Sequence, residues 1–160
     1  GPGDTYLLND SHVLPSLIRK FLVASKKSHN EVICWGTGTP LREFLYSDDL
    51  GNATVTLMKK FDINRADEDK KNFDYSPAIF NVGSGCEISI KELAKKIAKL
   101  TGFEGQIKWD TSKPDGTPKK QLDVTRINNL GWQYKIKLND GINDTVKEYK
   151  KYFHKDMIRK

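Results

Sequence analysis

A loop punctuated by proline and glycine carries the cations of this chain that are best placed for chemistry. It spans residues 112–121, with the sequence Ser-Lys-Pro-Asp-Gly-Thr-Pro-Lys-Lys-Gln. Its two prolines fix φ and its glycine permits the turn between them, so the loop is rigid. Its lysines supply the charge that attracts phosphate oxygens. The loop suits a diphosphate, and we expect Lys120 to contact it while Lys113 and Lys119 stay solvated.

A second candidate segment is residues 35–44, Trp-Gly-Thr-Gly-Thr-Pro-Leu-Arg-Glu-Phe. Trp35 ends an apolar stretch at a Gly-Thr-Gly turn. Its indole is either a core side chain or a flat surface for a base or sugar. Arg42 follows the proline of this turn and could donate two hydrogen bonds to a diphosphate. The alternative for Arg42 is an ion pair with Glu43 or Asp48.

Three further side chains have both a structural and a chemical interpretation. His12 begins a helical stretch at Ser-His-Val-Leu-Pro, where an imidazole could move protons near neutral pH, although most histidines have no chemical task. Lys20 lies two turns further along the same stretch and is either a solvated lysine or a ligand contact. Asp115 is a turn residue by composition. The Gly83-Ser84-Gly85 turn resembles a phosphate-binding glycine pair, but it lacks the full dinucleotide fingerprint.

These residues must be positioned by alternating helices and strands. Apolar spacing predicts helices over about 11–25, 50–61, 89–102, 125–130 and 140–153, and strands over 31–35, 43–46, 78–82 and 106–109. The third helix has the strongest local signals, a Ser89–Glu92 capping box and a terminal Gly102. Ser11 and Ser47-Asp48-Asp49 are expected to cap the first two helices, and residues 62–77 to form a charged loop. The alternation predicts a single α/β domain with a sheet covered by helices.

Composition limits the classes of function. The chain has 160 residues, 37% hydrophobic and 30% charged, with a formal charge of +6. The lysines are scattered without an aromatic platform, so a nucleic-acid-binding module is the less favoured alternative. No apolar run is long enough to span a bilayer, and we expect a cytoplasmic protein without a membrane partner. Cys34 and Cys86 lie in apolar contexts that favour buried thiols over a disulfide, a metal site or a nucleophile.

The motifs at 35–44 and 112–121 resemble the C-terminal half of GDP-L-fucose synthases, which are extended short-chain dehydrogenase/reductases. The resemblance covers nearly the whole chain and implies the C-terminal substrate-binding portion of a Rossmann-type α/β enzyme, with an incomplete sheet and flanking helices. It implies residues 1–160 as one nucleotide-sugar-binding domain. The implied activity is NADPH-dependent 3,5-epimerisation and 4-reduction of a GDP-4-keto-6-deoxy sugar, giving GDP-L-fucose or a related GDP-6-deoxy sugar. The substrate domain of another NDP-sugar epimerase or dehydratase is the alternative.

The resemblance also implies roles for individual residues. His12, in its Ser-His-Val-x-Pro motif, becomes a catalytic proton donor or acceptor and this chain's contact to the cofactor. The residues implied to hold the GDP-sugar are Lys20, Trp35, Arg42, Asp115 and Lys120. No metal is implied.

Two family motifs are missing from the sequence. It contains neither the Gly-x-x-Gly-x-x-Gly turn that binds the dinucleotide nor the Tyr-x-x-x-Lys pair of the reduction chemistry. The chain also opens on Gly1-Pro2-Gly3-Asp4 without a methionine. We therefore expect a fragment whose absent N-terminal half binds most of the NADPH. Alone, it should be inactive and monomeric, whereas the intact family forms homodimers.

Overall fold

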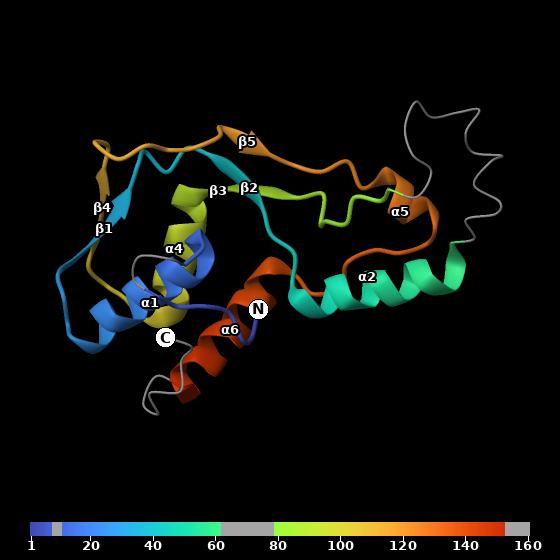
Figure 1. Cartoon of the computed structure of the whole chain (residues 1–160). Coiled ribbons are helices and arrows are strands. Elements are labelled where there is room, and N and C mark those ends of the chain that lie inside the picture. The colour runs from blue at the N-terminus through green and yellow to red at the C-terminus, as the bar shows by residue number, and fades with distance from the viewer. Residues whose placement is uncertain (8–10, 62–78, 153–160) are drawn as a thin grey trace.

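The computed structural model describes residues 1–7, 11–61 and 79–152, and it is an α/β fold with two small sheets (Figure 1). The helices are α1 (Val13–Lys26), α2 (Ser47–Lys60), α4 (Ile90–Thr101), α5 (Thr125–Asn129) and α6 (Leu138–Tyr152). The strands are β1 (Glu31–Trp35), β2 (Leu41–Glu43), β3 (Glu87–Ser89), β4 (Gln106–Asp110) and β5 (Lys119–Lys120). No helix in the described ranges is long and apolar enough to cross a membrane.

The two sheets have different pairing. Strands β1 and β4 run parallel, from Glu31 opposite Gln106 to Trp35 opposite Asp110. The second sheet has the order β3-β2-β5, in which β2 pairs antiparallel with β3 and parallel with β5. Strand β2 is therefore central. It pairs on one side with β3, which leads into α4, and on the other with β5, which follows β4.

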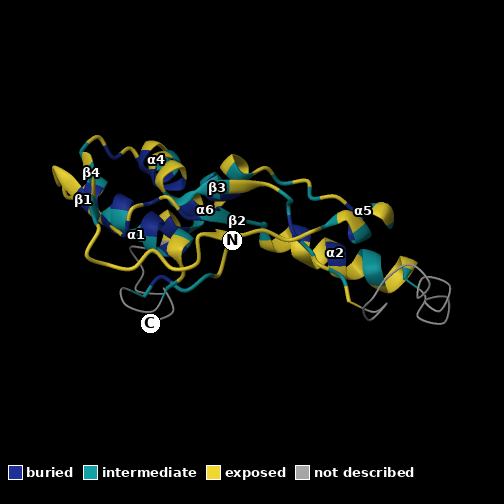
Figure 2. Cartoon of the chain, turned by 90° about the horizontal axis from the view of Figure 1, so that it is seen from above, coloured by how far each residue is buried: buried dark blue, intermediate teal, exposed yellow. Residues whose placement is uncertain are grey.

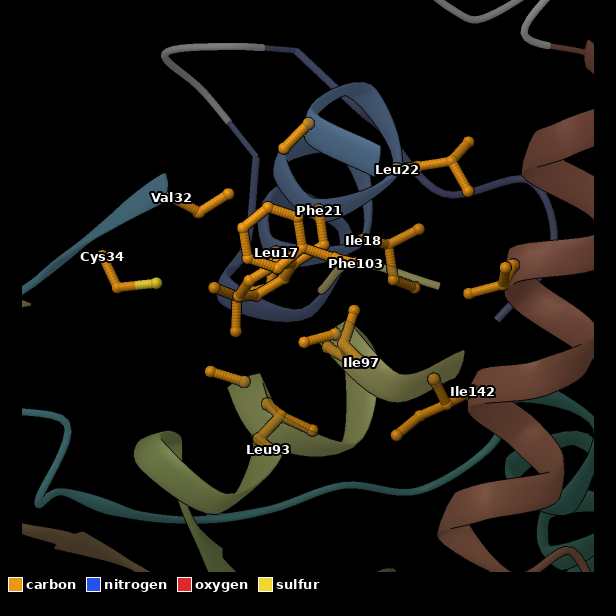
Figure 3. Close-up of a cluster of buried hydrophobic side chains, with 14 of the residues drawn as sticks. Leu17, Ile18, Phe21, Leu22, Val32, Cys34, Leu93, Ile97, Phe103 and Ile142 are labelled. Carbon is orange, nitrogen blue, oxygen red and sulfur yellow. The ribbon is translucent and has the colours of Figure 1, made fainter. Parts of the chain in front are cut away.

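The main core lies between α1, α4, α6 and one face of β1 (Figure 3). Helix α1 presents Ile18 and Phe21 inward, and both are fully buried. The Phe21 ring packs on Phe103 with ring centroids 5.4 Å apart. Val32 and Cys34 alternate with exposed residues along β1 and close the core from the sheet side.

A smaller cluster lies where α2 and α5 meet. It is built around Ala53, Ile127 and Trp132, with Phe80 and Val82 packed against it. Figures 1 and 2 show α2 and α5 extending as an arm away from α1, α4 and β1. The outer side of α2 carries the exposed residues Leu50, Val55 and Met58.

The local signals around α4 are confirmed. Ser89 Oγ accepts a hydrogen bond from the Glu92 N–H at 3.1 Å, and the Glu92 carboxylate accepts one from the Ser89 N–H. Gly102 ends the helix in the left-handed conformation with φ 73°. The predicted strands at 31–35 and 106–109 and the two C-terminal helices are also present.

The predicted caps of the first two helices are wrong. His12 rather than Ser11 is the N-cap of α1, and the buried Ser11 Oγ has no partner among the described residues. Helix α2 begins at Ser47 with Tyr46 as N-cap. The Asp49 carboxylate lies inside the helix and accepts hydrogen bonds from the N–H groups of residues 135 and 136. At α2, a contact with a distant segment thus uses a carboxylate that was expected to cap the helix.

Two predicted strands are displaced. The extended piece expected at 43–46 is β2 at Leu41–Glu43, because its backbone pairs with β3 and β5 before the chain turns into α2. Residues 79–82 form no strand, and β3 occurs at Glu87–Ser89 instead. Cys34 is buried as predicted, but Cys86 is exposed. The predicted charged loop at 62–77 lies outside the described residues.

Candidate functional site

Three of the candidate residues line a single cavity of about 510 Å³. His12 reaches it from the start of α1, Arg42 from β2 and Lys120 from β5. The start of α6 and Tyr46 complete the walls. Three segments that are distant in the chain therefore bring an imidazole, a guanidinium and an ammonium group to the same space.

Arg42 and Lys120 are brought together by strand pairing. They occupy opposed positions in the parallel ladder between β2 and β5. Arg42 Nη1 donates to the Leu41 carbonyl at 2.7 Å, and Arg42 forms no ion pair with Glu43 or Asp48. The structural alternative considered for Arg42 is therefore not observed, and its remaining N–H donors are available to an anion.

The residues beside Lys120 differ from it in their contacts. Lys119, which we expected to be solvated, forms an ion pair with Glu87 at 3.0 Å. The Gln121 side chain donates to the Gly85 carbonyl at 2.9 Å. Lys120 has no hydrogen-bond or ion-pair partner among the described residues, so its ammonium group is the uncommitted one of the Lys-Lys pair.

The two candidate loops are joined through Asp115. Its carboxylate accepts hydrogen bonds from the Thr37 N–H at 2.6 Å and the Thr37 hydroxyl at 2.7 Å. These bonds hold the pKa of the Asp115 carboxyl below its usual range. Gly36 permits the approach, because a Cβ on it would lie 2.1 Å from Asp115 Oδ1. Asp115 thus has a structural role that fixes both loops beside the cavity.

Trp35 and Lys20 lie together but outside this cavity. Trp35 is 65% exposed, which excludes the core interpretation, and the Lys20 ammonium lies 5.5 Å from its ring centroid. Lys113, also expected to be solvated, lies 5.9 Å from the same ring. Lys20 Nζ also donates to the Ile33 carbonyl at 3.2 Å. The structure therefore forms two groups of candidates, separated by the Asp115 loop.

The glycine turn at 83–85 already holds an anion. Glu43 Oε1 accepts a hydrogen bond from the Gly85 N–H at 2.7 Å, and a Cβ on Gly83 would lie 2.2 Å from the same oxygen. Turns of this kind bind anions through their backbone N–H groups. Here a side-chain carboxylate takes the position that a cofactor phosphate would need, so this turn does not fit a dinucleotide phosphate.

Sequence reasoning missed some of the cavity wall. Lys137 lines the cavity from the turn before α6, and Asp4 and Tyr46 line it from elsewhere. Lys137 stands among other lysines in an irregular stretch, without a motif that would separate it from a solvated residue. Within the described ranges, no group of His, Cys, Asp and Glu residues could hold a metal ion.

An α/β fold with a cationic cavity beside a parallel strand pair fits the comparison with known families. Residues 1–83 match the NAD dependent epimerase/dehydratase family, and the chain belongs to that family. The fold class predicted from the sequence is confirmed, as is the resemblance to GDP-L-fucose synthases.

Individual relatives narrow the likeness. The probable GDP-L-fucose synthase 1 of Oryza sativa subsp. japonica is 44% identical over 149 residues, which are 93% of this chain and 42% of the relative. A solved GDP-6-OMe-4-keto-L-xylo-heptose reductase from C. jejuni has a TM-score of 0.81 at 31% identity. The match covers 92% of this chain and 50% of the reductase chain. A GDP-L-fucose synthetase from Naegleria fowleri bound to NADP also has a TM-score of 0.81, at 28% identity. This match covers 100% of this chain and 46% of the synthetase chain. This chain thus spans half or less of the length of these relatives.

Proposed function

We propose that this chain supplies the nucleotide-sugar-binding part of an NADPH-dependent GDP-4-keto-6-deoxy-sugar 3,5-epimerase/4-reductase. Its product would be GDP-L-fucose or a related GDP-6-deoxy sugar. The observation that carries the proposal is the shared cavity of His12, Arg42 and Lys120. The relatives named above support the choice of a GDP-sugar, since two of them are GDP-L-fucose synthases or synthetases by name and the third is a GDP-heptose reductase.

Arg42 and Lys120 are assigned to the diphosphate. A guanidinium can donate two parallel hydrogen bonds to phosphate oxygens, and an ammonium adds a compact positive charge. The two residues are register partners on neighbouring strands, so the backbone already places them side by side before the ligand binds. Lys137 is a third cation on the cavity wall and adds to its attraction for an anion.

His12 is assigned to proton transfer. Epimerisation at C3 and C5 requires removal and return of a proton at carbons next to the C4 ketone, and imidazole is suited to both steps. His12 lies at the N-cap of α1, where its side chain makes no capping hydrogen bond. The His12 side chain is therefore free of that structural task, and His12 lines the cavity that we assign to the sugar.

NADPH would supply the hydride that reduces C4. Because the glycine turn at 83–85 is filled by Glu43, we assign its binding mainly to residues that this chain does not contain, with His12 as the contact from this chain. The 160-residue chain should therefore not consume NADPH by itself.

Trp35, Lys20 and Asp115 are assigned to the part of the nucleotide that extends beyond the cavity. An exposed indole with cations beside it offers a stacking surface for a flat base. Asp115 lies between this surface and Arg42, since Arg42 Nη2 would be 3.6 Å from a Cβ on the next residue, Gly116. A GDP moiety along this loop would contact both groups of residues.

Calorimetric titration of GDP, UDP and dTDP into the chain tests the proposal. We expect GDP to bind at least about tenfold more tightly than the other two, a difference of about 1.4 kcal/mol. Equal affinity for the three, or a preference for UDP or dTDP, would contradict the GDP-sugar assignment and favour another NDP-sugar epimerase or dehydratase. Consumption of NADPH with a GDP-keto sugar by the chain alone would contradict the assignment of NADPH binding mainly to residues outside this chain.

A further inference from the structure

The Glu43 carboxylate connects three segments that meet beside the cavity. Glu43 belongs to β2, next to Arg42. One carboxylate oxygen accepts from the Gly85 N–H at 2.7 Å, and the other accepts from the Leu122 N–H at 2.9 Å. Gly85 precedes β3, and Leu122 follows β5. A single side chain therefore bonds to the backbone beyond both edge strands of the three-stranded sheet.

These bonds matter because β5 is short. The strand contains only Lys119 and Lys120, so its own ladder gives little restraint. Leu122 extends the attachment two residues beyond Lys120, through Glu43, and Gln121 adds its bond to the Gly85 carbonyl. Without the carboxylate, the chain after Lys120 would lose its direct link to β2.

The geometry is shaped for this carboxylate. Gly83 is buried, and any Cβ there would lie 2.2 Å from Glu43 Oε1. Both backbone partners are donors, so they match a group that only accepts hydrogen bonds. A neutral amide could satisfy one of the two N–H groups but would turn its NH₂ toward the other.

We infer that Glu43 is a positioning residue, which holds Lys120 beside Arg42 on the cavity wall and so governs affinity for the diphosphate. This inference rests on the proposed function, because it assumes that the cavity binds the diphosphate of GDP. Glu43 also lines the cavity, but a carboxylate repels a diphosphate, so we assign its favourable effect to its bonds with the 83–85 turn and the backbone after β5.

The test is a double-mutant cycle on GDP affinity, using the whole chain and variants shown to be folded by circular dichroism. Glu43→Ala should weaken GDP binding roughly tenfold, and Glu43→Gln should weaken it less, because residues coupled through a backbone shift interact on this scale. In a Lys120→Ala background, the effect of Glu43→Ala should largely disappear. Guanosine, which lacks phosphate, should bind all variants alike. Glu104→Ala is the matched control, since it removes the same charge from an exposed position.

The outcomes separate the two claims. If the unmodified chain does not bind GDP, the proposed function fails and the inference fails with it. If the unmodified chain binds GDP but Glu43→Ala and Glu43→Gln bind it as tightly as Glu104→Ala, only the positioning role of Glu43 is overturned. An undiminished effect in the Lys120→Ala background, or an equal loss of guanosine binding, would overturn it as well. Should Glu43→Ala not fold, Glu43→Gln alone carries the comparison.

Discussion

Asp115 accepts hydrogen bonds from both the backbone N–H and the hydroxyl of Thr37, at 2.6 and 2.7 Å. These bonds join the turn that follows β1 to the loop that precedes β5. Trp35 lies on one side of this junction and Arg42 on the other. The two groups of candidate ligand residues are therefore held in fixed relation by one carboxylate.

The Asp115–Thr37 contact should make stability depend on pH. The hydrogen bonds lower the pKa of Asp115 in the folded chain. The contribution of Asp115 to the free energy of unfolding is therefore complete above the unfolded pKa of about 3.9, and it is lost as pH falls through the folded pKa. Asp115→Asn should lower the melting temperature at pH 7, and its difference from the unmodified chain should shrink below about pH 4. Thermal unfolding across pH 2–8 measures this. Thr37→Val, which keeps the N–H donor, should give a smaller loss; a difference that does not change with pH would contradict the account.

Two glycines, Gly38 and Gly51, should respond in opposite directions to alanine. Gly38 has φ +75°, and a Cβ on it would lie 2.6 Å from the Trp109 ring. Gly38→Ala should therefore cost about 1–3 kcal/mol of unfolding free energy. Gly51 lies in α2 with nothing within 4 Å of a Cβ, so Gly51→Ala should add up to about 1 kcal/mol through helix propensity. Urea unfolding measures both, and a loss at Gly51 equal to that at Gly38 would contradict the local geometry.

Removing the Tyr6 hydroxyl should not harm the core. Tyr6 is 4% exposed, its ring lies 4.2 Å from that of Tyr149, and its hydroxyl has no partner among the described residues. Tyr6→Phe should keep the ring contact and raise the unfolding free energy by about 1 kcal/mol, because an unpaired buried polar group is removed. Tyr6→Ala should cost about 3–5 kcal/mol through loss of the ring. A destabilised Tyr6→Phe in urea unfolding would show that the hydroxyl has a partner.

Replacing the two paired cations should weaken GDP binding in different ways. Arg42→Lys keeps the charge but loses the forked donors, so we expect roughly three- to tenfold weaker binding, and about tenfold or more for Arg42→Ala. Lys120→Ala should resemble Arg42→Ala. Lys119→Ala is the matched control, since Lys119 is committed to Glu87, and calorimetry should show a smaller effect for it. A larger loss from Lys119→Ala than from Lys120→Ala would reverse the assignment of the Lys-Lys pair.

Local signals were sufficient for part of the fold. The cap residues of α4 and the turn after it depend on neighbours within four residues, so the helix could be predicted almost to its ends. The bounds of β2 and the lack of a strand at 79–82 depend on which segments pair. An apolar run in the sequence does not show which segment it will pair with. The buried Asp49 carboxylate likewise accepts hydrogen bonds from the N–H groups of residues 135 and 136, a contact that the sequence around Asp49 does not predict.

The candidate site shows the same division. Arg42 and Lys120 could be selected by residue type and loop chemistry, but only strand pairing shows that they lie side by side. The glycine turn at 83–85 has an anion-binding shape whichever anion fills it, and the sequence could not show that Glu43 does so. Lys137 was missed because the tertiary position of α6 brings it to the cavity. Lys20 lies beside the Trp35 ring and does not line the cavity.

The central claim is that the cavity of His12, Arg42 and Lys120 binds the diphosphate of GDP. Amide chemical shifts of the ¹⁵N-labelled chain, followed during titration with GDP, test it most directly. We expect the largest saturable shifts at Arg42, Lys120 and the start of α1, with smaller ones at Trp35, and their loss in Lys120→Ala. Saturable shifts confined to other surfaces, with Arg42 and Lys120 unmoved, would contradict the claim.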